Sequence, residues 1–125
     1  MKTSTTSMEP RKQKRFHADN RMYAVLEYKP ALMGRIINIS KAGFAVLYPS
    51  NGQRLSESSD VDIFRLDSDF YMEKIKIKTV SDFEIATAYP FGLGKIRQRG
   101  MQFGEMKPIQ MFQLNYFLQS YTLLE

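Results

Sequence analysis

Residues 34–48 have the sequence GRIINISKAGFAVLY, and this stretch decides the fold class. Two apolar runs, residues 34–39 and 44–48, lie on either side of the polar turn 40–43. Runs of β-branched and aromatic residues on both sides of a short turn that contains glycine are typical of a β-hairpin. The stretch therefore predicts two paired antiparallel strands.

Further strand patterns flank this hairpin. Four more strands are predicted, at residues 21–28, 61–66, 74–80 and 96–103, with residues 83–86 as an extension of the third. In residues 74–80, isoleucine or threonine alternates with lysine, so one face of the strand is apolar and the other is charged. Such alternation is typical of an antiparallel sheet with one solvated face. Gly100 is expected to form a bulge in the last strand.

The end of the chain changes its periodicity. From Pro108, which suits the first turn of a helix, apolar residues recur at helical spacing: Ile109, Met111, Phe112, Leu114, Phe117, Leu118, Tyr121 and Leu124. The pattern predicts an all-β fold with a terminal helix, namely a six-stranded antiparallel β-barrel with a C-terminal α-helix packed on it. Since this helix is apolar over more than one face, part of it is expected to contact a partner or to form a homo-oligomer.

Composition excludes several classes of protein. The 125 residues fit one domain, and 43% hydrophobic with 25% charged residues is typical of a globular chain. The absence of cysteine excludes disulfides, thiolate metal sites and cysteine nucleophiles, and the single histidine, His17, excludes a multi-histidine metal site within one chain. We see no nucleophile–base pair or cofactor loop, so we expect neither an enzyme nor a bound cofactor. No apolar run reaches the roughly 18–20 residues that span a bilayer, and the polar N-terminus lacks a secretory core, so a cytoplasmic location is expected.

The positive charge is concentrated at the N-terminus. Residues 1–21 carry six cations against two carboxylates, which accounts for most of the net charge of +5. Those cations are Lys2, Arg11, Lys12, Lys14, Arg15 and Arg21. A local excess of this kind indicates an anionic partner such as a phosphate ligand, a nucleic acid or an acidic lipid surface, or else a solvated basic tail. The polar residues 1–9 are expected to form a mobile arm, and residues 10–125 the folded domain.

Two short motifs stand out within this frame. The first is Arg11-x-x-x-Arg15, and the second is Asn38-x-Ser40-x-x-Gly43 at the predicted hairpin turn. Each is common alone, because Asn, Ser and Gly in a turn are explained by local hydrogen bonds and by a backbone position that needs a positive φ. Together, in this order and strand context, they resemble the PilZ domain family, whose late strand is similar to residues 99–103 here.

That resemblance implies a bacterial domain that binds cyclic dimeric GMP (c-di-GMP), through Arg11, Arg15, Asn38, Ser40 and Gly43. Arginine suits such a ligand because its planar fork bonds to the O6/N7 edge of guanine or to phosphate, and stacks on a purine. Asn38 is expected to recognise a guanine edge and Ser40 to donate to a phosphate oxygen. Gly43 is expected to let the backbone turn sharply and approach the ligand.

The resemblance therefore implies a sensor or adaptor that regulates a downstream protein in motility, exopolysaccharide production, biofilm formation or virulence. One alternative is a small nucleic-acid-binding barrel, with the basic arm on phosphates and Tyr23, Tyr28, Phe44 and Tyr48 as stacking platforms. Another is a PilZ-like interaction module that does not bind the nucleotide.

Other residues carry weaker signals. His17 lacks an evident catalytic partner and is expected to line the ligand site or the surface. Residues 67–69 lack the glycine and glutamate of a calcium loop, and residues 92–95 lack the spacing of a phosphate-binding loop. The lysines of residues 74–78 are expected to form a solvated strand face.

Overall fold

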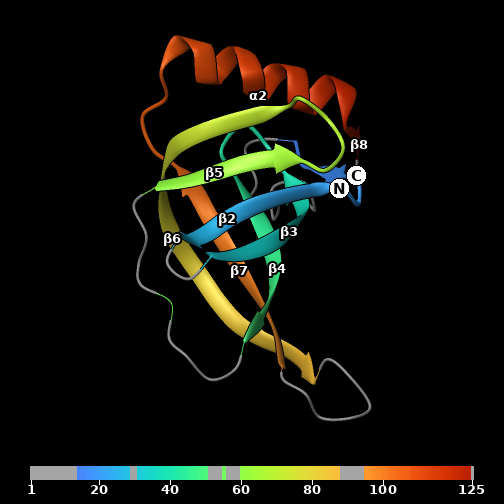
Figure 1. The fold of residues 1–125 in the computed structure, drawn as a ribbon, viewed down its shortest axis with the longest axis vertical. Coiled ribbons are helices and arrows are strands. Elements are labelled where there is room, and N and C mark those ends of the chain that lie inside the picture. The colour runs from blue at the N-terminus through green and yellow to red at the C-terminus, as the bar shows by residue number, and fades with distance from the viewer. Residues whose placement is uncertain (1–13, 29–30, 51–54, 56–59, 88–94, 125) are drawn as a thin grey trace, which may run out of the picture.

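The structure, a computed structural model, describes residues 14–28, 31–50, 55, 60–87 and 95–124 (Figure 1). Within these residues it contains eight strands and one helix. In chain order they are β1 (Phe16–Ala18), β2 (Met22–Tyr28), β3 (Ala31–Ile39), β4 (Gly43–Ser50), β5 (Asp60–Arg65), β6 (Tyr71–Thr87), β7 (Lys95–Phe103), α2 (Pro108–Ser120) and β8 (Thr122–Leu124).

Six of the strands form a closed antiparallel barrel. Its order is β2-β5-β6-β7-β4-β3, and pairing between β2 and β3 closes the circle. The predicted barrel is therefore confirmed. Strands β1 and β8 were not predicted. They extend the sheet beyond the barrel, with β1 pairing to β3 and β8 pairing to β1.

Every second side chain of the strands points into the barrel and fills its core. On β2, Met22, Ala24 and Leu26 are buried and the residues between them face outward. On β6, Ile75 and Ile77 are buried while the lysines on either side are exposed, as predicted. The core therefore lies inside the barrel, and the outer faces of the strands remain available for a site.

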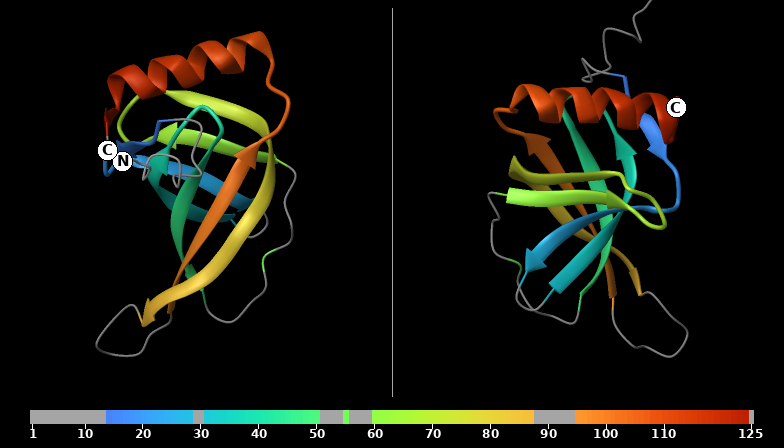
Figure 2. Two further views of the ribbon diagram at one scale, coloured as in Figure 1. Left: turned by 180° about the vertical axis from the view of Figure 1, so that it is seen from behind. Right: turned by 45° about the horizontal axis from the view of Figure 1, so that its top comes forward.

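Helix α2 closes one end of the barrel, while β6 and β7 run on to the opposite end (Figures 1 and 2). Leu114, Phe117 and Leu118 point into the core, and the buried Gln110 donates to the backbone oxygen of Glu73 at 3.0 Å. The periodicity predicted a helix that continues to about Leu124, but α2 ends at Ser120. The chain then becomes extended and pairs with β1 as strand β8.

Two local predictions are wrong in detail. The bulge lies in β6 opposite Gly100, where Thr79 pairs with Met101 and Ser81 with Gly100, leaving Val80 as the extra residue. Strand β4 also continues past residue 48. Beyond Leu47, β4 pairs with β7 but no longer with β3, so its other edge is open there. Pro49 is tolerated on this open edge because it has no N–H to donate.

Candidate functional site

The turn between β3 and β4 is held by Ser40. The Ser40 N–H donates to the Gly43 oxygen at 2.8 Å, and the Ser40 Oγ accepts from the N–H groups of Ala42 at 3.0 Å and Gly43 at 3.3 Å. The Phe103 N–H donates to the Ala42 oxygen at 2.8 Å, which ties the turn to the end of β7. These hydrogen bonds hold the turn together, and the O–H of the buried Ser40 makes a long contact, at 3.5 Å, with the Gly43 oxygen.

Gly43 is required by a close approach of two backbones. A Cβ at this position would lie 2.1 Å from the Met101 oxygen and 3.0 Å from the Gln102 Cα, so β4 and β7 are in contact there. Its φ lies outside the left-handed region, which corrects the expectation of a positive φ at this turn. The physical reason for glycine is the lack of space for any side chain.

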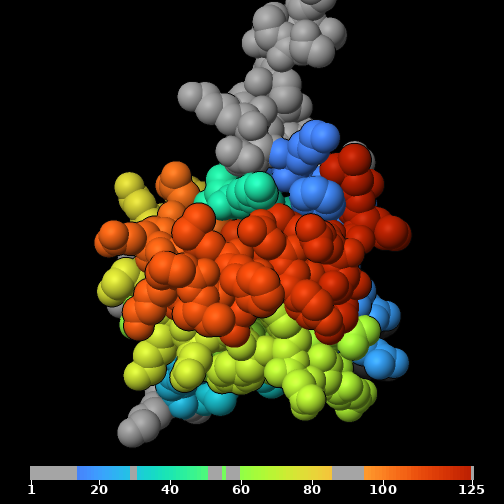
Figure 3. All heavy atoms as spheres, turned by 90° about the horizontal axis from the view of Figure 1, so that it is seen from above, coloured from blue at the N-terminus to red at the C-terminus, as the bar shows by residue number. Residues whose placement is uncertain are grey.

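Strand β1 brings Arg15 to this turn. Phe16 pairs with Ile39 and His17 with Asn38, so one step earlier in this antiparallel register Arg15 lies at the level of Ser40. Phe16 packs against the core, and alternation places Arg15 and His17 on the outer face. Figure 3 shows the β3–β4 turn (teal) and β1 (blue) on the same flank of α2.

A row of small residues extends this face across the sheet. In direct register, His17 on β1 pairs with Asn38 on β3, Asn38 with Ala45 on β4, Ala45 with Gly100 on β7, and Gly100 with Ser81 on β6. A Cβ on Gly100 would lie 2.6 Å from the Ser81 Oγ, so a side chain there would require that hydroxyl to rotate away. We call the set Ala45, Gly100 and Ser81 the small-residue floor.

Exposed cations lie at the turn end of the floor. Arg15 precedes β1, Lys41 lies in the turn, and Lys78 on β6 pairs with Gln102, which pairs in turn with Gly43. A flat floor beside amide, hydroxyl and cationic groups can accept a planar anionic ligand. Among the described residues no cluster of three or more His, Asp or Glu groups could hold a metal ion.

Four of the five predicted site residues converge here: Arg15, Asn38, Ser40 and Gly43. Arg11 lies outside the described residues, as does the predicted arm 1–9. The small-residue floor was not predicted from the sequence, and Lys78 was predicted only as part of a solvated strand face. The floor depends on register between distant strands, and the only local signal for it was Gly100.

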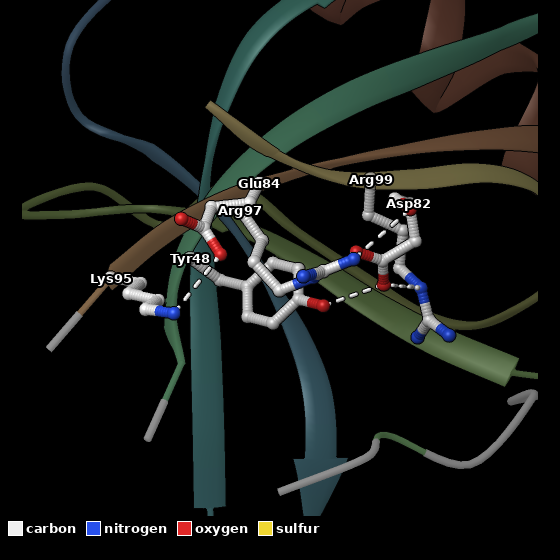
Figure 4. A network of polar contacts seen from close by, with 6 residues as sticks. All are labelled: Tyr48, Asp82, Glu84, Lys95, Arg97 and Arg99. Carbon is white, nitrogen blue, oxygen red and sulfur yellow. Dashed lines mark hydrogen bonds and ion pairs between the residues drawn. The ribbon is translucent and has the colours of Figure 1, made fainter. Parts of the chain in front are cut away.

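A polar network supports the strands that carry the floor (Figure 4). Asp82 on β6 accepts from the Tyr48 hydroxyl at 2.5 Å and from the Arg97 Nε at 2.7 Å, and its other ion pair is to the Arg99 Nε at 3.2 Å. Burial and the hydrogen bond to Asp82 raise the pKa of Tyr48 to about 12. The network therefore joins β4, β6 and β7 through one carboxylate.

No family model matches the sequence, and no curated protein matches it. Solved structures do match the fold. The PilZ domain of YcgR from Escherichia coli, solved with c-di-GMP, aligns with a TM-score of 0.67 at 14% identity over 90% of this chain and 92% of that one. The fold is that of a PilZ domain.

A second solved structure with the PilZ fold is the K. pneumonia MrkH–c-di-GMP complex. It aligns with a TM-score of 0.67 at 15% identity, over 89% of this chain and 52% of MrkH. Another structure, of MrkH described as a c-di-GMP-dependent transcription regulatory factor, gives a TM-score of 0.64 at 13% identity over 49% of its length. This chain therefore spans about half the length of MrkH.

The structure also bears on the other sequence-based expectations. Phe44 and Tyr48 are buried in the core of this PilZ fold, so two of the four aromatics proposed for base stacking face inward. His17 lies on the candidate face, opposite Asn38. In the part of the chain that the structure describes, no helix has the length and apolar character needed to cross a membrane.

Proposed function

We propose that this protein is a receptor for c-di-GMP that regulates a downstream protein in a bacterial cytoplasm, with c-di-GMP as its ligand and no catalytic role. The observation that carries the proposal is the meeting of Arg15, Asn38 and Ser40 on one outer face, beside a floor of small residues. The PilZ fold supports it, because YcgR and MrkH were solved with this nucleotide.

The proposed roles follow from the chemistry of the ligand. Arg15, with Arg11 before it in the chain, binds a guanine edge or a phosphate through two parallel N–H donors. The Asn38 amide pairs with a guanine edge. The Ser40 O–H donates to a phosphate oxygen, in place of its long contact, at 3.5 Å, with the Gly43 oxygen. The small-residue floor lets the flat purine lie close to the sheet.

Isothermal titration calorimetry of the full chain tests this assignment, with c-di-GMP as ligand and GTP and cyclic dimeric AMP as controls. Arg15→Ala removes charge-assisted bonds worth about 1.5–3 kcal/mol, so affinity should fall roughly ten- to hundred-fold. Arg21→Ala is the matched control, since it removes one exposed arginine whose contact with Asp67, at 4.0 Å, is weak.

Selective binding that weakens in Arg15→Ala and not in Arg21→Ala supports the receptor. Absence of binding to c-di-GMP, or equal loss in both variants, contradicts it. Binding of oligonucleotides that falls steeply with salt would support the nucleic-acid alternative instead.

A further inference from the structure

The bulge in β6 brings two side chains of this strand to the candidate face. Lys78 pairs with Gln102 and Ser81 with Gly100, so three steps along β6 match two steps along β7, and Val80 is the extra residue. In a regular strand, residues three positions apart point to opposite sides. The bulge instead places Lys78 and Ser81 on the same outer side, and bulges are over-represented beside active sites because they re-aim side chains in this way. Strand β6 therefore contributes a cation to the face as well as part of the floor.

Lys78 lies at the end of a row of residues at the level of the β3–β4 turn. The row runs in direct register from Lys78 on β6 to Gln102 on β7 and Gly43 on β4. The Ser40 N–H donates to the Gly43 oxygen at 2.8 Å, and the register of β1 against β3 continues the row to Arg15. The left view of Figure 2 shows β4, β7 and β6 side by side. The row therefore has an exposed cation at each end, with amide, backbone and hydroxyl groups between them.

The length of this row suits one ligand that carries two anionic groups. Neighbouring strands lie about 4.8 Å apart, so four steps separate the backbones of Arg15 and Lys78 by about 19 Å. Both side chains have long flexible stems, and the gap between their charges shortens when they lean toward each other. A cyclic dinucleotide has two phosphodiesters and can meet a cation on each side. A ligand with a single phosphate can meet only one of them.

The neighbouring lysine on the same strand lies in a different setting. Lys76 is exposed on the same outer side, but it pairs with Asp60 on β5, and the Gly104 N–H donates to its backbone oxygen beyond the end of β7. Lys78 instead lies beside the uncharged Gln102, in the row that contains Gly43. Lys76 is therefore a matched control, because it has the same charge and exposure on the same strand but lies outside this row.

We propose that Lys78 binds the second phosphate of the ligand, at the side of the candidate face opposite Arg15. The inference rests on the proposed function, because it takes c-di-GMP as the ligand. It adds β6 to a site whose other polar groups come from Arg15 and from the β3–β4 turn. With cations on both sides, the site favours ligands with two phosphates over mononucleotides.

Isothermal titration calorimetry of the full chain with c-di-GMP, at several salt concentrations, tests this role. Lys78→Ala should weaken binding roughly tenfold, because it removes a charge-assisted bond to phosphate. The affinity of this variant should also depend less on salt than that of the wild type, since one ion pair with the ligand is lost. Lys78→Arg keeps the charge and should retain most of the affinity. Lys76→Ala should bind like the wild type.

Circular dichroism checks that the variants are folded, which is expected because both lysines are exposed. Affinity that is unchanged in Lys78→Ala, or that falls equally in Lys76→Ala, overturns the inference and leaves the proposed function in place. A loss that Lys78→Arg does not restore also overturns it, because the ligand would then not depend on this charge. Wild-type protein that does not bind c-di-GMP overturns the proposed function, and the role of Lys78 with it.

Discussion

Two carboxylates, Asp62 and Asp82, organise the polar groups around the core. Asp62 accepts from the hydroxyls of Tyr28 and Tyr71 and, at 2.8 Å, from the Lys74 N–H. Burial alone would raise the pKa of Asp62, but the Lys74 N–H and the two hydroxyls hold it below its usual value. Asp82 accepts from the Tyr48 hydroxyl and forms ion pairs with Arg97 and Arg99. Each carboxylate is thus bound to groups on different strands.

Removal of Asp82 should destabilise the fold. Arg99 is only 4% exposed, so in Asp82→Ala its guanidinium stays buried without this carboxylate. We expect a loss of about 3 kcal/mol in the free energy of unfolding. Glu84→Ala is the control, because its ion pair with Lys95 is exposed and is worth about 1 kcal/mol or less. Urea denaturation measures both, and equal losses would contradict the assigned role of Asp82.

Stability should fall at alkaline pH because of the tyrosines. The pKa of Tyr48 is raised from 10.0 to about 12 by burial and the bond to Asp82, and that of Tyr71 to about 12 by its bond to Asp62. Above pH 10 the unfolded chain releases these protons while the folded chain retains them, so stability is lost between pH 10 and pH 12.

Chemical denaturation at a series of pH values, with tyrosinate absorbance as a second signal, measures this loss. In Tyr48→Phe the slope of stability against pH over that interval should be smaller than in the wild type. A free energy of unfolding that stays constant through the interval would show that these hydroxyls are not protected in the fold.

At the scale of elements, the site depends on the contact between β4 and β7. Their pairing runs without interruption from Gly43 opposite Gln102 to Ser50 opposite Lys95. At the Gly43 end of this pairing the two backbones are in contact. There the Phe103 N–H also donates to the Ala42 oxygen, in the turn that carries Ser40. The position of the candidate ligand groups is therefore set by sheet packing.

Gly43→Ala should separate β4 from β7. Its Cβ would lie 2.1 Å from the Met101 oxygen, a backbone atom that cannot move alone. We expect a loss of about 2 kcal/mol or more in stability, with weaker ligand binding as a consequence. Gly104→Ala is a milder control, because its nearest neighbour is the Lys76 Cβ at 3.2 Å. Thermal unfolding compares the two, and a Gly43→Ala protein as stable as the wild type would contradict the close approach.

The sequence predicted the elements that have a strong local pattern. Strands β2 to β7 were found because apolar and polar residues alternate or gather between turns, and α2 because Pro108 precedes a helical period. Strands β1 and β8 have three residues each and pair with each other across the whole length of the chain. No local pattern could have indicated them, and the end of α2 was misplaced for the same reason.

The candidate site was predictable in part. Arg15, Asn38, Ser40 and Gly43 were found through two spaced motifs, and the register of β1 against β3 brings them together. Ala45 and Ser81 belong to no motif, and they join the floor only because distant strands place them beside Gly100. Ile109 and Phe112 on the outer face of α2 are exposed, and the contact of this helix with a partner stays a prediction.

At the scale of the whole molecule, the two ends of the described chain are joined. Arg65 at the end of β5 forms an ion pair with Asp19 at 2.9 Å, and its guanidinium lies 4.6 Å from the centre of the Tyr121 ring. The Asp19 N–H also donates to the Tyr121 oxygen at 2.9 Å. This contact joins the segment after β1 to the end of α2, so β1 and the helix are held together.

Arg65→Gln should loosen this junction. It removes both the ion pair with Asp19 and the cation–π contact with Tyr121, while the strand pairing of β5 remains. Hydrogen exchange should be faster at the Asp19 N–H and along β1 and β8, with little change in β2 or β5. Exchange that is unchanged at Asp19, or that rises uniformly over the barrel, would contradict a local role for Arg65.

The central claim is that one outer face, carrying Arg15, Asn38, Ser40 and the small-residue floor, binds c-di-GMP. The most direct test is an NMR titration of the isotope-labelled full chain, following each backbone amide as c-di-GMP is added. We predict large shifts at Arg15, Asn38, Ala45 and Gly100, and small ones at Tyr23 and Phe64 on the β2–β5 side. Shifts concentrated on β2 and β5, or no shifts at saturating nucleotide, would contradict the account.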